Sequence, residues 1–76
     1  VAVRAGLAKA LREARLERRW TQTQLAEELG SSQSRVAKME AADPSVSIDL
    51  LVRSLIVSGA SGQKIGAAFS PIGRRR

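Results

Sequence analysis

Two short helical stretches separated by a glycine dominate the middle of the chain. The first begins after Thr21, and Gln24 completes a capping box three residues later, in which each side chain bonds the backbone N–H of the other residue. This helix therefore begins at Gln22. Gly30 follows, and glycine adopts without strain the left-handed conformation in which many helices end. The pattern predicts a helix of about two turns followed by a tight turn.

The second stretch begins directly after this turn. Ser32 is a favoured N-cap residue and predicts a helix over residues 33–40. Val36 and Met39 are three residues apart, so we expect them to face the core from one side of that helix. Pro44 ends the pattern because proline cannot continue a helix.

Helical patterns also lie on both sides of this central pair. Residues 3–19 contain many strong helix formers and no proline. The expected core positions of this helix are Leu7, Leu11 and Ala14. Another helix is expected between the cap residue Ser47 and Gly59, and a weaker one over residues 61–69.

The helix between Ser47 and Gly59 carries apolar residues on two sides. One side is expected to hold Ile48, Leu51, Val52 and Leu55, and the opposite side Leu50, Ser54 and Val57. A helix with two such sides needs two partners. Ile65 and Phe69 of the last helix are candidates, and they either fold back within the chain or reach across to a second copy. Because the core of so short a chain is thin, we favour the second alternative, a homodimer.

The chain has 76 residues, the size of one small domain. We predict that residues 1–70 form an all-α domain, a compact bundle of four to five short helices, and that residues 71–76 form a basic tail. The absence of Cys and His excludes disulfides, the usual zinc ligand sets and catalysis that needs a Cys or His side chain. Asp43 and Asp49 lie at a helix end and in a first helical turn rather than as a catalytic pair. We therefore predict no enzymatic activity, no cofactor and no metal.

No apolar run approaches the roughly 20 residues that a membrane span requires. The longest, residues 50–57, is interrupted by Arg53 and Ser54. There is also no signal-peptide pattern, and together with the absence of Cys this predicts a cytoplasmic protein that does not contact membranes.

The charge of the chain favours a polyanionic partner. Thirteen Lys and Arg residues against seven Asp and Glu residues give a formal net charge of +6. Aromatic residues make up only 3% of the chain, too few for a platform on which single-stranded bases stack. Double-stranded DNA is therefore the expected partner.

The segment TQTQLAEELGSSQSRVAKME, residues 21–40, resembles the helix-turn-helix of the phage-repressor and Cro-like (XRE-type) regulators. The resemblance extends from about Leu7 to Gly59 and implies a lambda-repressor-like DNA-binding domain with its helix-turn-helix at 22–41. In that family the second helix of the motif enters the major groove.

The resemblance assigns DNA contacts to the outward sides of the two helices. The expected base-contacting residues are Gln33, Ser34, Ala37 and Lys38. Glutamine can bond the edge of adenine, lysine can bond guanine, and the alanine methyl group can touch the thymine methyl group. The expected phosphate-contacting residues are Gln22, Thr23, Ser32 and Arg35. Arg35 lies at the edge of the reading side, so exposure to solvent is an equal alternative for it.

Two further sets of charged residues are expected to act other than by contacting bases. Arg15 and Glu40 match an ion pair of this family that joins the first helix to the end of the third, which implies a structural role. Arginines of the first helix lie mostly away from its apolar stripe, where they either face solvent or contact phosphate, namely Arg4, Arg12, Arg18 and Arg19.

Three functions are compatible with these features. The first is a sequence-specific transcriptional regulator, a repressor that acts as a homodimer on a palindromic site. The second is an antitoxin that represses its own operon, with a toxin protein as its partner. The third is a helical adaptor that keeps the fold but binds protein, because fold alone does not determine function.

Overall fold

The computed structural model of the chain describes residues 2–60 and 62–69. These residues form five helices and no strand, so the predicted all-α bundle is confirmed. In chain order the helices are α1 (Ala2–Glu17), α2 (Gln22–Leu29), α3 (Gln33–Glu40), α4 (Ile48–Val57) and α5 (Gly62–Phe69).

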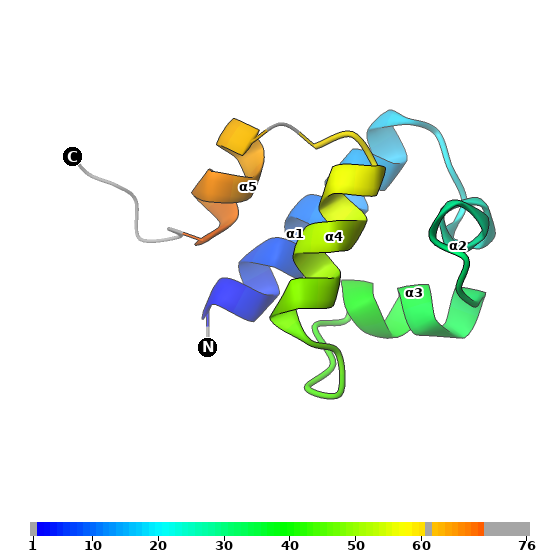
Figure 1. The fold of residues 1–76 in the computed structure, drawn as a ribbon, viewed down its shortest axis with the longest axis horizontal. Coiled ribbons are helices and arrows are strands. Elements are labelled where there is room, and N and C mark those ends of the chain that lie inside the picture. Colours follow the sequence, from blue (N-terminus) through cyan, green and yellow to red (C-terminus); the bar gives the residue numbers. More distant parts are fainter. Residues whose placement is uncertain (1, 61, 70–76) are drawn as a thin grey trace.

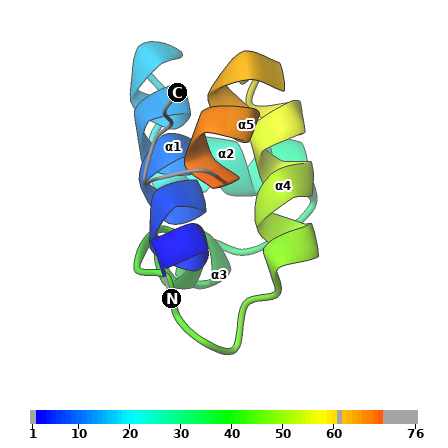
Figure 2. The same ribbon diagram turned by 90° about the vertical axis from the view of Figure 1, so that its left-hand side faces the viewer.

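The helices α1 and α4 lie side by side at the centre of the molecule (Figure 1). At one end α5 packs against α1, and at the other end α2 and α3 pack against each other. The view from the α5 end shows α1 and α4 on either side, with α3 crossing below them (Figure 2).

One hydrophobic cluster joins the first four helices. Its buried members are Leu7, Leu11, Leu25, Ala26, Val36, Met39, Val46, Leu51 and Leu55. Burying a Leu, Val or Met side chain contributes about 1.5–3 kcal/mol. This cluster therefore holds α2 and α3 at a fixed angle against α1 and α4.

The helix α1 ends two residues earlier than the sequence predicts. The prediction was wrong here because no glycine or proline marks the end. Arg19 instead takes the left-handed conformation, with a φ of 59°. Its N–H donates to the Leu16 carbonyl at 2.9 Å, and the Trp20 N–H donates to the Arg15 carbonyl at 3.1 Å. These two bonds form a Schellman motif, which satisfies carbonyl groups at the end of the helix.

The two apolar sides expected on α4 are not opposite each other. Ser54 is fully buried with Leu51 and Leu55, and its hydroxyl donates to the Leu50 carbonyl at 2.8 Å. This local bond satisfies the polar group, so serine can lie in the core. Val57, which was expected to lie beside Ser54, is 38% exposed.

Arg4 of α1 and Arg18, the residue directly after α1, each bond a backbone carbonyl. Arg4 donates from Nη1 to the Val46 carbonyl, and Arg18 donates from Nε to the Ser58 carbonyl at 2.8 Å. Arg4 lies seven residues before Leu11, about two helical turns, and is half-buried, whereas Arg18 is exposed. They join α1 to the segments on either side of α4, a role that the sequence analysis missed, while Arg18 is exposed as one of the two alternatives predicted.

The helix α5 is held within the chain. Ile65 is half-buried against the hydrophobic cluster, and Lys64 forms an ion pair with Glu17 of α1 at 2.9 Å. Ile65 therefore follows the fold-back alternative, whereas the side chain of Phe69 lies outside the described residues. Among the described helices none is long and apolar enough to cross a membrane.

Candidate nucleic-acid interface

The arrangement of α2 and α3 depends on local signals at the ends of both helices. The capping box is present: the Thr21 side chain accepts from the Gln24 N–H at 3.0 Å, and the Gln24 side chain accepts from the Thr21 N–H at 2.8 Å. Gly30 has a φ of 65°, and Ser32 caps α3 by accepting the Arg35 N–H at 3.2 Å. These signals fix where the two helices begin and where α2 ends.

The outward side of α3 is polar and accessible. Gln33, Ser34 and Lys38 are exposed and Ala37 is half-buried. The opposite side carries Val36 and Met39 in the core, so the helix cannot rotate to bury its polar side. Arg35 is also exposed.

The first turn of α2 lies next to the first turn of α3. The Gln22 side chain, which is half-buried, accepts a hydrogen bond at its Oε1 from Gln33 Nε2, with a separation of 2.6 Å. The structure thus brings together Gln22, which is expected to contact phosphate, and Gln33, which is expected to contact a base. Thr23 and Ser32 are exposed near them in the sequence, and the Ser32 hydroxyl lies 3.4 Å from that of Ser34.

An ion pair lies beneath these glutamines. Arg15 Nε is 2.6 Å from Glu40 Oε2 and Nη2 is 3.1 Å from Oε1, while Nη1 donates to the Trp20 carbonyl at 2.8 Å. The two side chains are only 11% and 6% exposed. The pair joins α1 to the end of α3, as a structural role requires.

The sequence analysis missed a third contact of Glu40. Its Oε1 also accepts from Gln22 Nε2, at 3.2 Å. The two residues are 18 positions apart and on different helices, so no spacing in the sequence indicates this contact. It depends on the angle at which α2 and α3 cross.

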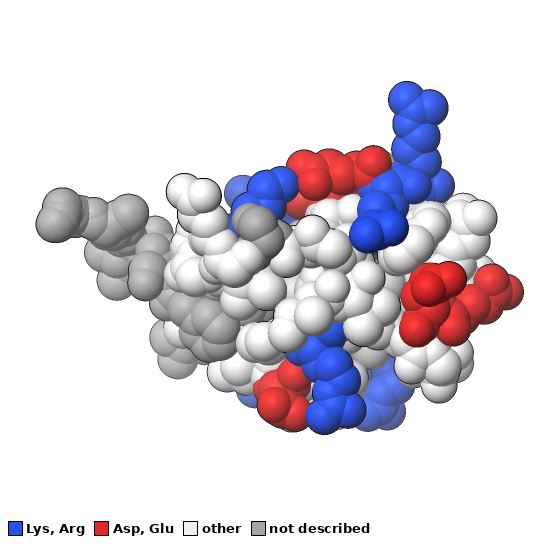
Figure 3. Space-filling view, turned by 45° about the horizontal axis from the view of Figure 1, so that its top comes forward, with Lys and Arg blue, Asp and Glu red and all other residues white. Residues whose placement is uncertain are grey.

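The charges around the two helix starts suit an anionic ligand. Neither α2 nor α3 has an acidic residue in its first turn, so the positive ends of both helix dipoles are not neutralised there. The acids of α2, Glu27 and Glu28, follow later in the helix, and both are exposed. A space-filling view shows an acidic patch at the α2 end, separate from the Lys and Arg side chains of the same face (Figure 3).

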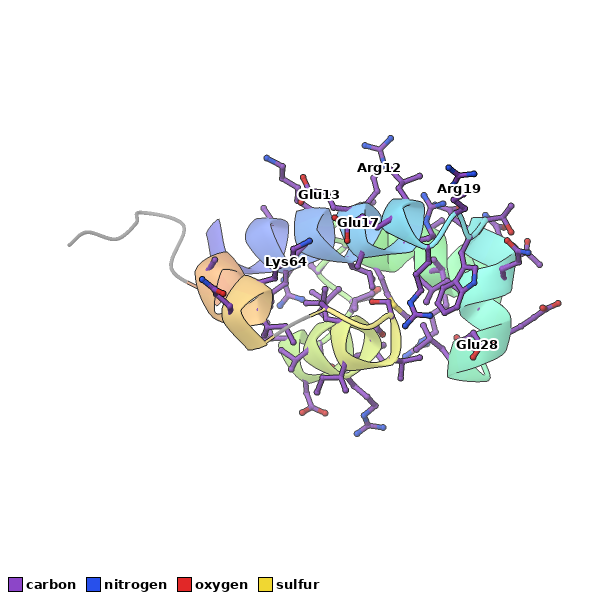
Figure 4. The ribbon with its side chains drawn as sticks, turned by 90° about the horizontal axis from the view of Figure 1, so that it is seen from above. Arg12, Glu13, Glu17, Arg19, Glu28 and Lys64 are labelled. Atoms are coloured by element: carbon purple, nitrogen blue, oxygen red, sulfur yellow. The ribbon has the colours of Figure 1, made fainter. Side chains whose placement is uncertain are left out.

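The side of α1 seen at the top of Figure 4 carries both acidic and basic side chains. Arg12 and Glu13 of α1 and Arg19, beyond its end, project outward on this side (Figure 4). This side therefore carries side chains of both signs.

A family model described as "Helix-turn-helix" matches residues 11–53, which is more than half of the chain. The chain belongs to the XRE-type helix-turn-helix family. It is therefore a DNA-binding regulator of the XRE type. The match begins in α1 and ends in α4, so it includes all of α2 and α3 and both members of the Arg15–Glu40 pair. No curated protein matches the chain, and no solved structure does. Within the described residues there is no group of three or more side chains that could hold a metal ion.

Proposed function

We propose that the protein represses transcription by reading a specific duplex DNA site with α3. The observation that carries this proposal is the exposed polar side of α3, which is fixed outward by Val36 and Met39 in the core. Gln33 bonds an adenine edge and Lys38 a guanine edge, while Ser34 and Ala37 lie where they meet neighbouring base edges or a thymine methyl group.

The starts of α2 and α3 hold the DNA backbone in this proposal. Gln22 and Thr23 contact one phosphate with the positive end of α2 behind it. The Ser32 oxygen accepts the Arg35 N–H, so its hydroxyl hydrogen is the group that bonds a phosphate oxygen, with Ser34 as the donor of the long contact between the two hydroxyls. Arg35 adds a charge-assisted contact at the edge of the site.

Repression in this proposal needs only a single domain of residues 1–70, which blocks access of other proteins to the site. Two copies bind a palindromic site with half-sites about 34 Å apart. Because Ile65 packs against the core of its own chain and is not left to cover a second copy, the two copies pair on the DNA rather than as a stable dimer in solution.

Selection of bound duplexes from a random DNA library tests the proposal. We expect a palindromic consensus, with binding at least about a thousandfold tighter than to scrambled DNA, and affinity that falls as salt rises. Equal affinity for the selected and scrambled duplexes would contradict sequence-specific reading. Binding that is absent at low salt would favour the protein-binding adaptor instead. Sedimentation of the protein with and without the selected duplex tests where the two copies pair.

A further inference from the structure

The Glu40 carboxylate has a second partner in addition to Arg15. Its Oε1 also accepts a hydrogen bond from Gln22 Nε2. A carboxylate in an ion pair can only accept hydrogen bonds, whereas a glutamine amide has a donor side and an acceptor side. The chemistry therefore forces Gln22 to turn its NH₂ group, and not its carbonyl oxygen, toward Glu40.

The orientation of the Gln22 amide in turn determines the orientation of the Gln33 amide. With its NH₂ group toward Glu40, Gln22 presents Oε1 to Gln33, and a carbonyl oxygen can only accept. Gln33 must then donate from Nε2, which it does at 2.6 Å. One N–H of Gln33 is used, and its second N–H and its carbonyl oxygen remain for a ligand in a fixed spatial order.

We propose that Glu40 is a positioning residue for DNA recognition, because it fixes through Gln22 the order of donor and acceptor that Gln33 presents to a base. The inference rests on the proposed reading of the major groove by α3. Adenine presents an acceptor at N7 beside a donor at N6, and a glutamine amide matches them in only one order for a given approach. An exposed glutamine without this constraint adopts either order by rotating its terminal amide.

The substitution Glu40→Gln tests this directly. The new amide keeps its oxygen at the shorter contact, toward Arg15 Nε at 2.6 Å, and so turns its NH₂ group toward Gln22 and toward Arg15 Nη2, which loses its acceptor. Gln22 and then Gln33 must reverse. We expect the side-chain amide NMR signal of Gln33 in the DNA-free protein to shift, and the preference for the selected base pair to fall about tenfold.

A second variant separates positioning from stability, because Glu40→Gln also weakens the ion pair. Gln22→Met leaves Arg15 and Glu40 paired but removes the link to Gln33. We expect the Gln33 amide signal to shift here as well, and the base preference to fall in addition to the loss of a phosphate contact. The matched control is Thr23→Ala, which removes a proposed phosphate contact one residue away. It should weaken binding to all duplexes equally and leave the Gln33 signal in place.

Arg15→Lys controls for the stability that Arg15 provides through its bonds to Glu40 and to the Trp20 carbonyl. It should lower the melting temperature, but Glu40 still accepts from Gln22, so the base preference should remain. Unchanged Gln33 signals and an unchanged base preference in both Glu40→Gln and Gln22→Met would overturn the inference. If the wild type selects no DNA sequence, the proposed function fails, while the Gln33 signal in the free protein still shows whether Glu40 orients the amide.

Discussion

The Arg18 guanidinium occupies the space that a side chain at residue 59 would need. A Cβ atom on Gly59 would lie 2.5 Å from Arg18 Nη2. The guanidinium is held there by its bond to the Ser58 carbonyl at 2.8 Å and by the Trp20 ring, whose centroid is 4.8 Å away. This contact closes the ends of α1 and α4 against each other.

Gly59→Ala should therefore destabilise the protein for two reasons. Gly59 has a φ of 85°, and a side chain in the left-handed region costs about 1–2 kcal/mol. The methyl group also displaces the end of the exposed Arg18 side chain, which adds at most about 1 kcal/mol for the lost hydrogen bond. Urea unfolding measures the sum.

Gly30→Ala is the matched control for this substitution. Gly30 has a φ of 65°, but nothing lies within 4 Å of the added Cβ, so only the backbone cost applies. Gly59→Ala should be more destabilising in the wild type, and the difference should disappear in an Arg18→Ala background. Equal effects of the two substitutions in the wild type would contradict the role of Arg18.

Ala42→Gly is expected to stabilise the protein. Ala42 has a φ of 57° after α3, and its N–H and that of Asp43 donate to the carbonyls of Met39 and Lys38 at 3.1 and 3.0 Å. Glycine removes the strain of this left-handed turn, a gain of up to about 1 kcal/mol after its greater unfolded-state entropy is subtracted. The adjacent Ala41 has a φ of −86°, so Ala41→Gly should gain nothing. The melting temperatures of the two variants decide between these outcomes.

The sequence predicts those parts of the fold whose signals are local. Thr21, Gly30 and Ser32 specify caps and a turn through bonds within three or four residues, and α2 and α3 have the predicted bounds. The end of α1 was mispredicted because Arg19 takes a conformation that its residue type does not favour. The link between Glu40 and Gln22 depends on how two helices cross, and no local pattern specifies that angle.

Removing one partner of the Arg15–Glu40 pair should be costly. Glu40→Ala leaves the Arg15 guanidinium, 11% exposed, without its carboxylate, and we expect a loss of about 3 kcal/mol. Arg53→Ala is the comparison, because the Asp49–Arg53 pair is 3.5 Å long and its side chains are 86% and 72% exposed. That substitution should change stability by less than about 0.5 kcal/mol. Similar melting temperatures for the two variants would show that the buried pair contributes little.

The stability of the protein should contain a small acid-sensitive part from Asp43. Hydrogen bonds from the Ser45 side chain and then from the Ser45 N–H, the latter at 2.8 Å, lower the pKa of Asp43 from its ordinary value of 3.8. Because the folded-state pKa is the lower one, the contribution is present above pH 3.8 and is lost as the pH falls through the lowered pKa. Asp43→Asn keeps an acceptor oxygen without a charge that titrates. The wild type should be the more stable of the two near neutral pH and lose this advantage in acid, and a difference that is constant with pH would contradict the assignment.

The last prediction tests whether α3 reads the bases. Gln33 and Lys38 are exposed and lie outside the core, so Gln33→Ala and Lys38→Ala should leave the melting temperature nearly unchanged. Each good base contact contributes about 1–3 kcal/mol of discrimination, so each variant should bind the selected duplex roughly tenfold or more weakly and bind scrambled DNA almost as before. Glu27→Ala on the solvent side of α2 is the control, since it should not change the ratio of the two affinities. If Gln33→Ala and Lys38→Ala weaken binding to both duplexes equally, these residues hold the DNA backbone, and the sequence must be read elsewhere on the protein.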